Sequence, residues 1–251
     1  PLEYTAFNDV CDKYKEYLLK MMKEHSMREE TVASYTSRLK VLLEWKEKKK
    51  VNLFYTYQFD RRVVGQFLDY VFVDRNNTIR TRNNYLCWVK TFCKYLLERG
   101  YVPTDPTAGM FTVQRKGEGK NRDVIPDNIL KEIHDWLSAN NKHFLLACYI
   151  LHYCLVRPHE MSFLKVGDFS IEKQTLYLHG ENTKNKNDAV ITVPQQVLKL
   201  MVELKVFNSP SGYYLFSDGF APGKLRKSEK QFRDYWLHHV RKNLNFSDRY
   251  K

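Results

Sequence analysis

The sequence has no apolar run long enough to cross a membrane, which takes about 18 residues, because its richest apolar stretch, residues 144–155, is broken by His152. Its first residues show no charged segment followed by an apolar stretch, which is the pattern of a signal peptide. Internal repeats and low-complexity segments are also missing. We therefore expect a globular cytoplasmic protein with no membrane partner.

Cysteine is scarce, and its positions exclude two classes of site. The five cysteines are odd in number and contain no Cys-x-x-Cys pair, which argues against a disulfide framework and a zinc site. Each has apolar or aromatic neighbours at helical spacing, so we expect reduced, buried thiols. We expect no metal and no other cofactor. The cysteines are Cys11, Cys87, Cys93, Cys148 and Cys154.

Charge is plentiful and mainly positive. Hydrophobic residues make up 43% of the 251 residues, which is enough for a core and excludes intrinsic disorder. The formal net charge of +12 favours a polyanionic partner. Residues 1–115 and 219–251 each carry +6, whereas residues 116–218 are neutral. This distribution fits a protein that contacts nucleic acid through two regions of its fold, and equally a soluble domain with a positive surface.

The first part of the chain, residues 1–108, predicts a small bundle of amphipathic helices. Apolar residues recur at steps of three and four in segments that begin near residues 7, 30, 63 and 78. Gly100 ends the last helix, and Pro103 and Pro106 prevent its continuation. Residues 109–124 are polar, basic and glycine-bearing without an apolar period, which predicts an interdomain linker.

The second part, residues 125–251, mixes helical and strand patterns. Helical periodicity returns after Pro126 and includes a buried helix over residues 143–155. Residues 175–179 and 189–193 are alternating or β-branched and flank a turn, which predicts a β-hairpin with lysines at its tip. Helices follow over 195–206 and 227–244. The fold class is therefore mainly α with a small antiparallel β-hairpin or sheet.

Arg157 follows a strongly apolar helix, where a guanidinium is costly unless an anion or a carboxylate receives it. One interpretation is an ion pair with Glu160 that pins two helices. The other is a planar fork held for a phosphate, with Glu160 orienting it. Lys184, on the turn between the predicted strands, is by itself an ordinary solvated lysine.

In combination these segments resemble the tyrosine recombinase (phage integrase) family. The motif of that family reads Gly-Leu-Arg-x-x-Glu, Leu-x-x-x-Asp, a strand, a Thr-Lys turn, and a strand ending in proline. The family's N-terminal part has Thr-x-x-x-Tyr, Thr-x-Asn-x-x-Leu and Asn-Pro. The resemblance covers nearly all of residues 4–245, with Asp105 for asparagine and Val156 for leucine as departures. The matching segments are 155–160, 164–168, 183–184 and 190–194, and 31–35, 81–86 and 105–106.

The resemblance implies a helical, SAM-like core-binding domain over residues 1–108 and a catalytic domain over residues 125–251. It implies a site-specific DNA recombinase, an integrase of a mobile element that acts without metal in a bacterial cytoplasm through a 3′-phosphotyrosyl intermediate. Arg157 would clamp the phosphate, Glu160 would orient Arg157, and Lys184 would be the general acid. The implied partners are double-stranded DNA and a homotetramer on paired sites, with no small-molecule substrate.

DNA contacts are expected from the helical domain and the linker, mostly to phosphates. For each residue a solvated charge is the alternative. The candidates are Arg38, Arg80, Arg82, Asn83, Lys90, Arg115, Lys116, Lys120 and Arg122.

The family's second box, His-x-x-Arg, and its nucleophilic tyrosine are not assigned to His238, Arg241 and Tyr250. His238 and Arg241 fall inside an amphipathic helical pattern, and Tyr250 follows Arg241 too closely for the intervening motif. We therefore expect a catalytic domain truncated at residue 251, inactive alone, with its nucleophile further on. Two alternatives stay open: a catalytically inactive DNA-binding regulator of the same fold, and a helical interaction protein that binds no nucleic acid.

Overall fold

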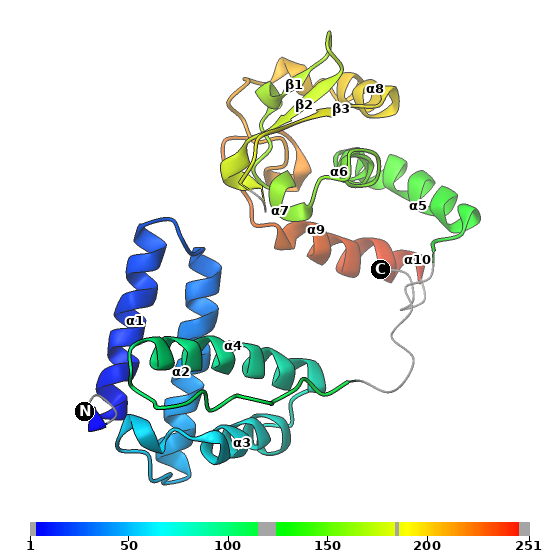
Figure 1. Cartoon of the computed structure of the whole chain (residues 1–251). Coiled ribbons are helices and arrows are strands. Elements are labelled where there is room, and N and C mark those ends of the chain that lie inside the picture. The colour runs from blue at the N-terminus through cyan, green and yellow to red at the C-terminus, as the bar shows by residue number, and fades with distance from the viewer. Residues whose placement is uncertain (1–3, 115–123, 184–185, 246–251) are drawn as a thin grey trace. The chain divides into compact units, whose positions relative to one another are not determined.

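The structure of the chain is a computed structural model that describes residues 4–114, 124–183 and 186–245 (Figure 1). It divides into two compact units, Pro1–Gly117 and Glu118–Lys251. Each unit has its own hydrophobic core. Within the described ranges, no helix combines the length and the apolar character that a membrane span requires.

The first unit is helical, as predicted from its apolar periodicity. A short 3₁₀ turn (Thr56–Gln58) precedes the third helix, and a π-helical segment (Tyr70–Asp74) extends it. The helices are α1 (Phe7–Lys23), α2 (Glu29–Lys48), α3 (Arg61–Asp69) and α4 (Ile79–Glu98).

Capping side chains and an aromatic core explain these helices. Asp60 accepts a hydrogen bond from the backbone N–H of Val63 at 2.8 Å and so caps α3. Thr78 caps α4 in the same way, and Gly100 follows α4 with a φ of +70°. On the buried face of α4, the rings of Trp88 and Phe92 stack with centroids 5.9 Å apart. The predicted apolar stripes are therefore the faces that the helices bury.

The second unit packs its helices around α6. This helix contacts both α5 and α8, and it lies between them in Figure 1. A π-helical segment (Trp236–Arg241) joins α9 to α10, and the predicted helix over 227–244 starts three residues later than expected. The helices are α5 (Asp127–Asn140), α6 (Lys142–Tyr153), α7 (Pro158–Met161), α8 (Gln195–Glu203), α9 (Lys230–Tyr235) and α10 (Lys242–Leu244), with 3₁₀ turns at Val166–Asp168, Gly180–Asn182, Val206–Asn208 and Asp218–Phe220.

A small antiparallel sheet completes the second unit. The predicted hairpin is formed by β2 (Thr175–Leu178) and β3 (Ala189–Thr192), and β1 (Phe169–Ser170) adds a third strand beside β2. Because β1 has only two residues, it shows no alternation that a sequence pattern could reveal. Leu176 and Leu178 on β2 face the core. The predicted fold class, mainly α with a small antiparallel sheet, is confirmed.

The prediction of buried thiols is wrong for one cysteine. Cys11, Cys93 and Cys154 are buried and Cys148 is partly buried, but Cys87 is exposed on α4. Its neighbours in the sequence are apolar, yet Cys87 itself points away from the stripe that α4 buries. Burial raises the pKa of the Cys11 thiol to about 12, which makes that thiol a packing group.

Candidate active site

Arg157 lies between α6 and α7, and its partner is the buried Glu160. One carboxylate oxygen of Glu160, Oε1, accepts a hydrogen bond from Arg157 Nη1 at 2.8 Å. The other, Oε2, accepts one from the backbone N–H of Arg157 at 3.0 Å. The side chain of Glu160 is 6% exposed, whereas that of Arg157 is 60% exposed. The predicted ion pair is present, and it leaves most of the Arg157 side chain facing solvent, where its guanidinium can still receive an anion.

The turn that leads to Arg157 has an unusual backbone. Leu155 has a φ of +54°, in the left-handed region that favours glycine, and the residue is 82% exposed. The next residue, Val156, is fully buried and anchors the turn. Such a conformation costs a non-glycine residue about 1–2 kcal/mol. Sequence reasoning missed this feature, although the family motif quoted above has glycine at the position of Leu155.

Glu160 also lines a small cavity that α7 shares with the sheet. The cavity measures about 10 Å³. Because Glu160 and Thr183 both line it, the structure brings Glu160, the partner of Arg157, next to Thr183 on the connection between β2 and β3. Lys184, the predicted partner of Arg157, lies outside the described residues. The walls of the cavity are Glu160, Phe163, Leu164, Asp168, Tyr177, Leu178, His179, Asn182 and Thr183.

The hairpin tip is held by close backbone contacts. The N–H of Gly180 donates to Asp188 Oδ1 at 2.6 Å, and this bond, followed by one from the Tyr177 hydroxyl, holds the pKa of Asp188 below its ordinary value. The bond to Asp188 raises the pKa of Tyr177. A Cβ added at Gly180 would lie 2.8 Å from the carbonyl oxygen of Lys186, so the chain passes too closely there for a side chain. The hydroxyl of Thr183 donates to the Gly180 carbonyl at 3.0 Å.

Asp168, in the motif Leu-x-x-x-Asp, has a structural role. Its side chain is 10% exposed. Asp168 Oδ2 accepts a hydrogen bond from the backbone N–H of Lys165 at 2.7 Å, and Oδ1 lies 3.0 Å from His179 Nε2. This carboxylate therefore ties the turn before β1 to the residue that follows β2, which fixes the base of the hairpin.

The DNA-contact candidates of the first unit differ in their surroundings. Arg80 and Lys90 are exposed on α4. Arg82 is half-buried, and its guanidinium lies 3.4 Å from the side-chain oxygen of Asn83. The guanidinium of Arg38 lies 5.8 Å from the ring centroid of Tyr85. Of the remaining candidates, Arg115, Lys116, Lys120 and Arg122 lie outside the described residues.

Asn83 makes a double contact with the segment that leaves the first unit. Its Nδ2 donates to the carbonyl of Val113 at 2.8 Å, and its Oδ1 accepts from the N–H of Val113 at 3.0 Å. The carboxamide thus holds the described beginning of the predicted linker against α4.

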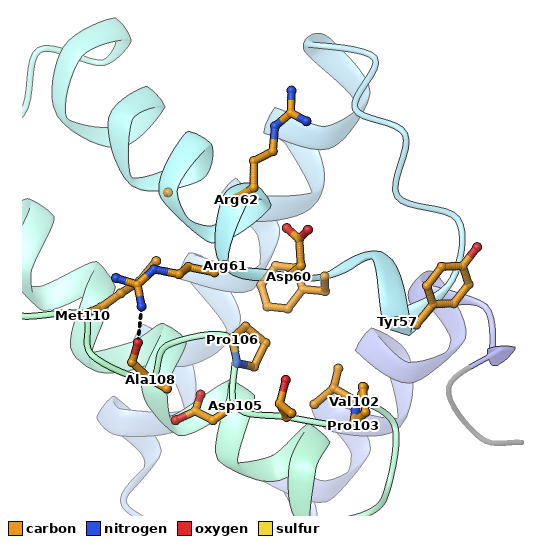
Figure 2. Close-up of a pocket in the computed structure, with 13 residues that line it drawn as sticks. Tyr57, Asp60, Arg61, Arg62, Val102, Pro103, Asp105, Pro106, Ala108 and Met110 are labelled. Carbon is orange, nitrogen blue, oxygen red and sulfur yellow. Dashed lines mark hydrogen bonds between the residues drawn. The ribbon is translucent and has the colours of Figure 1, made fainter.

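The first unit also has a cavity of about 850 Å³ beside the start of α3 (Figure 2). Arg61 reaches from α3 to the carbonyl of Ala108, and Arg62 points away from the other labelled residues (Figure 2). Asp60 caps α3, and Asp105 accepts hydrogen bonds from the N–H and the hydroxyl of Thr107 at 2.8 and 2.7 Å. Arg61 and Asp105 thus hold the turn over residues 102–110. Sequence reasoning missed the role of Arg61.

The helical run from α9 to α10 contains His238 and Arg241. His238 is exposed, Arg241 is partly buried, and Val240 between them is fully buried. The prediction that both belong to an amphipathic helix is confirmed. Tyr250 lies outside the described residues. Within the described ranges, no group of three or more His, Cys, Asp or Glu side chains is arranged to hold a metal ion.

No family model matches the chain, and neither does any curated protein. Solved structures do match. A lambda integrase dimer bound to a COC′ core site has a TM-score of 0.71 and 12% identity, over 97% of this chain and 83% of that one. A lambda integrase tetramer bound to a Holliday junction has a TM-score of 0.72 and 13% identity, over 98% and 68%.

The Tn1549 transposon integrase in complex with a circular intermediate DNA is also similar. Its TM-score is 0.63 and its identity 11%, over 90% of this chain and 79% of that one. These likenesses show that the chain has the tyrosine recombinase fold, so the fold implied by the sequence resemblance is confirmed. At such identities the likeness extends to the fold alone.

Proposed function

We propose that the protein is a site-specific recombinase of the integrase type, which cuts and rejoins double-stranded DNA through a 3′-phosphotyrosyl intermediate. The observation that carries this proposal is the buried Glu160 holding the exposed guanidinium of Arg157 beside the hairpin tip. The fold, shared with integrases solved on DNA, and the net charge of +12 support it.

In the proposed reaction a tyrosine oxygen attacks the scissile phosphorus, and the bond from phosphorus to the 5′-oxygen breaks. The tyrosine loses its proton, and the departing 5′-oxygen gains one. A 5′-hydroxyl of a second strand then reverses the step. The role of nucleophile is not assigned to any described residue.

Arg157 would clamp the phosphate whose non-bridging oxygens gain charge in the transition state. A guanidinium fixed at that place before the reaction stabilises the transition state more than the ground state. Glu160 would act as a positioning residue, because its two oxygens hold both the side chain and the backbone of Arg157. Lys184 would protonate the 5′-oxygen as general acid.

The proposed partner is duplex DNA, contacted by Arg38, Arg80, Arg82, Lys90 and the linker cations. One similar structure is a lambda integrase tetramer on a Holliday junction. We propose that this protein also forms a homotetramer on paired DNA sites. The likeness to a transposon integrase supports a mobile-element integrase. We propose that it acts in a bacterial cytoplasm.

A two-step experiment tests the proposal. Duplexes that bind the protein are first selected from a random-sequence pool. The best duplex is then nicked near the bound site and incubated with the protein, and a covalent protein–DNA adduct is measured. The adduct should form on the full-length protein that contains the nucleophilic tyrosine, and residues 1–251 alone should bind without forming it. Selective binding by the full-length protein without an adduct would favour the DNA-binding regulator, and a failure to select any duplex would contradict both DNA functions.

The general-acid assignment has its own test. In the full-length protein, Lys184→Ala should block adduct formation on the ordinary substrate and spare a substrate whose 5′-bridging oxygen is sulfur, because a thiolate leaves without protonation. Lys186→Ala is the matched control and should behave as wild type on both substrates. If Lys184→Ala cleaves the ordinary phosphate at the wild-type rate, Lys184 is not the acid.

A further inference from the structure

A second cation lies close to the candidate site and belongs to none of the predicted contacts. The guanidinium carbon of Arg226 lies 4.2 Å from the ring centroid of Phe163. The ring of His159 meets Phe163 from another direction, with centroids 5.1 Å apart and planes at 64°. Phe163 is half-buried and lines the same small cavity as Glu160. Phe163 therefore serves as a platform that presents the exposed Arg226 beside the cavity.

The loop that carries Arg226 is tightly built. The hydroxyl of the buried Ser217 donates to the carbonyl of Leu225 at 2.8 Å. Gly223 and Tyr214 exchange two backbone hydrogen bonds at 2.8 and 2.9 Å. A Cβ added at Gly223 would lie 2.7 Å from the side chain of Ser217, so this close approach requires glycine. The backbone next to Arg226 is thus ordered before any ligand arrives, which lowers the entropic cost of binding one.

Two carboxylates of neighbouring residues already have basic side chains as partners. Glu229 Oε2 lies 2.8 Å from His159 Nδ1, and Asp218 pairs with Lys227. The loop opens the segment 219–251, which carries +6. The guanidinium of Arg226 itself stacks on a ring, and stacking leaves its N–H edge available to phosphate oxygens. An exposed guanidinium held in this way has the chemistry to receive a phosphate.

We propose that Arg226, held on Phe163, binds a backbone phosphate of the same duplex whose scissile phosphate Arg157 clamps. This inference rests on the proposed function. The two guanidinium groups are assigned to one duplex because the partner of Arg157, Glu160, and the platform of Arg226, Phe163, line one cavity. Arg226 is thus a DNA-binding residue that positions the strand, and it takes no part in bond breaking.

The test is the salt dependence of duplex binding. Fluorescence anisotropy of a labelled mixed-sequence duplex is measured between about 50 and 200 mM KCl, a range in which phosphate contacts lose affinity steeply. Loss of one phosphate contact should lower the slope of log Kd against log[KCl] by about 1 in Arg226→Ala, and should weaken binding. Arg233→Ala is the matched control, since Arg233 is an exposed arginine of the same unit that pairs with Asp234.

A second variant tests the platform. Phe163→Leu keeps the charge of Arg226 and removes the ring, so it should weaken the binding of duplex DNA. In the Phe163→Leu background, Arg226→Ala should lower the affinity by less than it does in the wild-type protein. Arg226→Gln, which keeps a long polar side chain, replaces Arg226→Ala if that variant fails to fold.

The outcomes separate the inference from the proposed function. If the wild-type protein binds duplex DNA and Arg226→Ala matches Arg233→Ala in slope and affinity, the inference is overturned and the proposed function stands. An unchanged affinity in Phe163→Leu overturns the role of the platform. If the wild-type protein shows no salt-dependent binding of duplex DNA, the proposed function is contradicted, and the inference that rests on it falls with it.

Discussion

Arg61 in the first unit and Arg157 in the second occupy similar places and have different partners. Arg61 is the first residue of α3, and Arg157 directly precedes the first residue of α7. Free N–H groups at a helix start disfavour a nearby cation, and an acceptor for each guanidinium offsets this. Arg61 donates to the main-chain carbonyl of Ala108 in an exposed turn. Arg157 donates to the carboxylate of Glu160, which is almost fully buried.

The difference separates an arginine that supports the fold from one that is presented to a ligand. A carbonyl acceptor closes the turn over residues 102–110, and the bond serves the fold. A buried carboxylate requires a cation whatever the ligand state, and it holds Arg157 with most of its surface open. Exposure of an arginine is therefore weak evidence for a site, whereas burial of its carboxylate partner is stronger evidence.

The largest expected effect is on the rate of covalent adduct formation, and it tests the comparison of Arg61 with Arg157 directly. Arg157→Ala should lower the rate of covalent adduct formation by about 10²–10³-fold, the usual cost of one preorganised donor to a developing charge. Arg61→Ala should change that rate by less than about twofold, as surface substitutions do. Single-turnover adduct formation by the full-length protein on the selected duplex gives both rates, and urea unfolding checks that both variants are folded. An equal loss of rate in the two variants would contradict the assignment of Arg157 to a ligand and of Arg61 to the fold.

A second contrast between the units concerns the free energy of unfolding, which alanine substitutions at two glycines should change in opposite directions. A Cβ at Gly180 would press on the backbone of residues 186–188, so Gly180→Ala should destabilise the second unit by about 1–3 kcal/mol. A Cβ at Gly65, inside α3, would meet no heavy atom of the described residues within 4 Å. Gly65→Ala should therefore stabilise the first unit by about 0.5–1 kcal/mol.

Urea unfolding followed by residue-resolved hydrogen exchange assigns each of these changes to its unit. A destabilised Gly65→Ala would mean that α3 is more closely packed than the structure indicates. A neutral Gly180→Ala would mean that the hairpin tip adjusts its path.

Structure is predicted best from the sequence where it depends on residues within a single helix or turn. Helices of the first unit follow from apolar stripes, because each stripe is a face that is buried, as Trp88 and Phe92 show. The Arg157–Glu160 pair follows from a spacing of three residues, which places the carboxylate back at the start of the helix. Local patterns of this kind need no knowledge of the rest of the fold.

Local patterns do not predict contacts between segments that are distant in the sequence. Glu160 and Thr183 meet in one cavity because a strand register brings them together, and Arg226 reaches Phe163 through a loop 63 positions further along. The exposure of Cys87 depends on which face α4 turns outward, and its neighbours alone do not state this. Tertiary packing therefore decided these features.

A smaller effect tests whether Asn83 belongs to the fold or to the DNA interface. Asn83→Ala removes two hydrogen bonds to Val113, each worth about 0.5–1.5 kcal/mol, so hydrogen exchange at Val113 should speed up as the segment loosens. Asn84→Ala, an exposed neighbour, is the control and should leave exchange unchanged. Unaltered exchange at Val113 together with weaker DNA binding would instead place Asn83 among the DNA contacts.

The smallest effect concerns the turn that presents Arg157. Leu155 holds a left-handed backbone with its side chain in solvent, so Leu155→Gly relieves about 1–2 kcal/mol of strain and adds about 0.5–1 kcal/mol of chain entropy to the unfolded state. The net gain in the free energy of unfolding should be about 0.5–1 kcal/mol, measured as a higher urea midpoint. Leu155→Ala keeps the strain and removes an exposed side chain, so it should be close to neutral. A loss of stability in Leu155→Gly would mean that the side chain of Leu155 makes a contact that outweighs its backbone, and Arg157 would then be positioned by more than the Glu160 carboxylate.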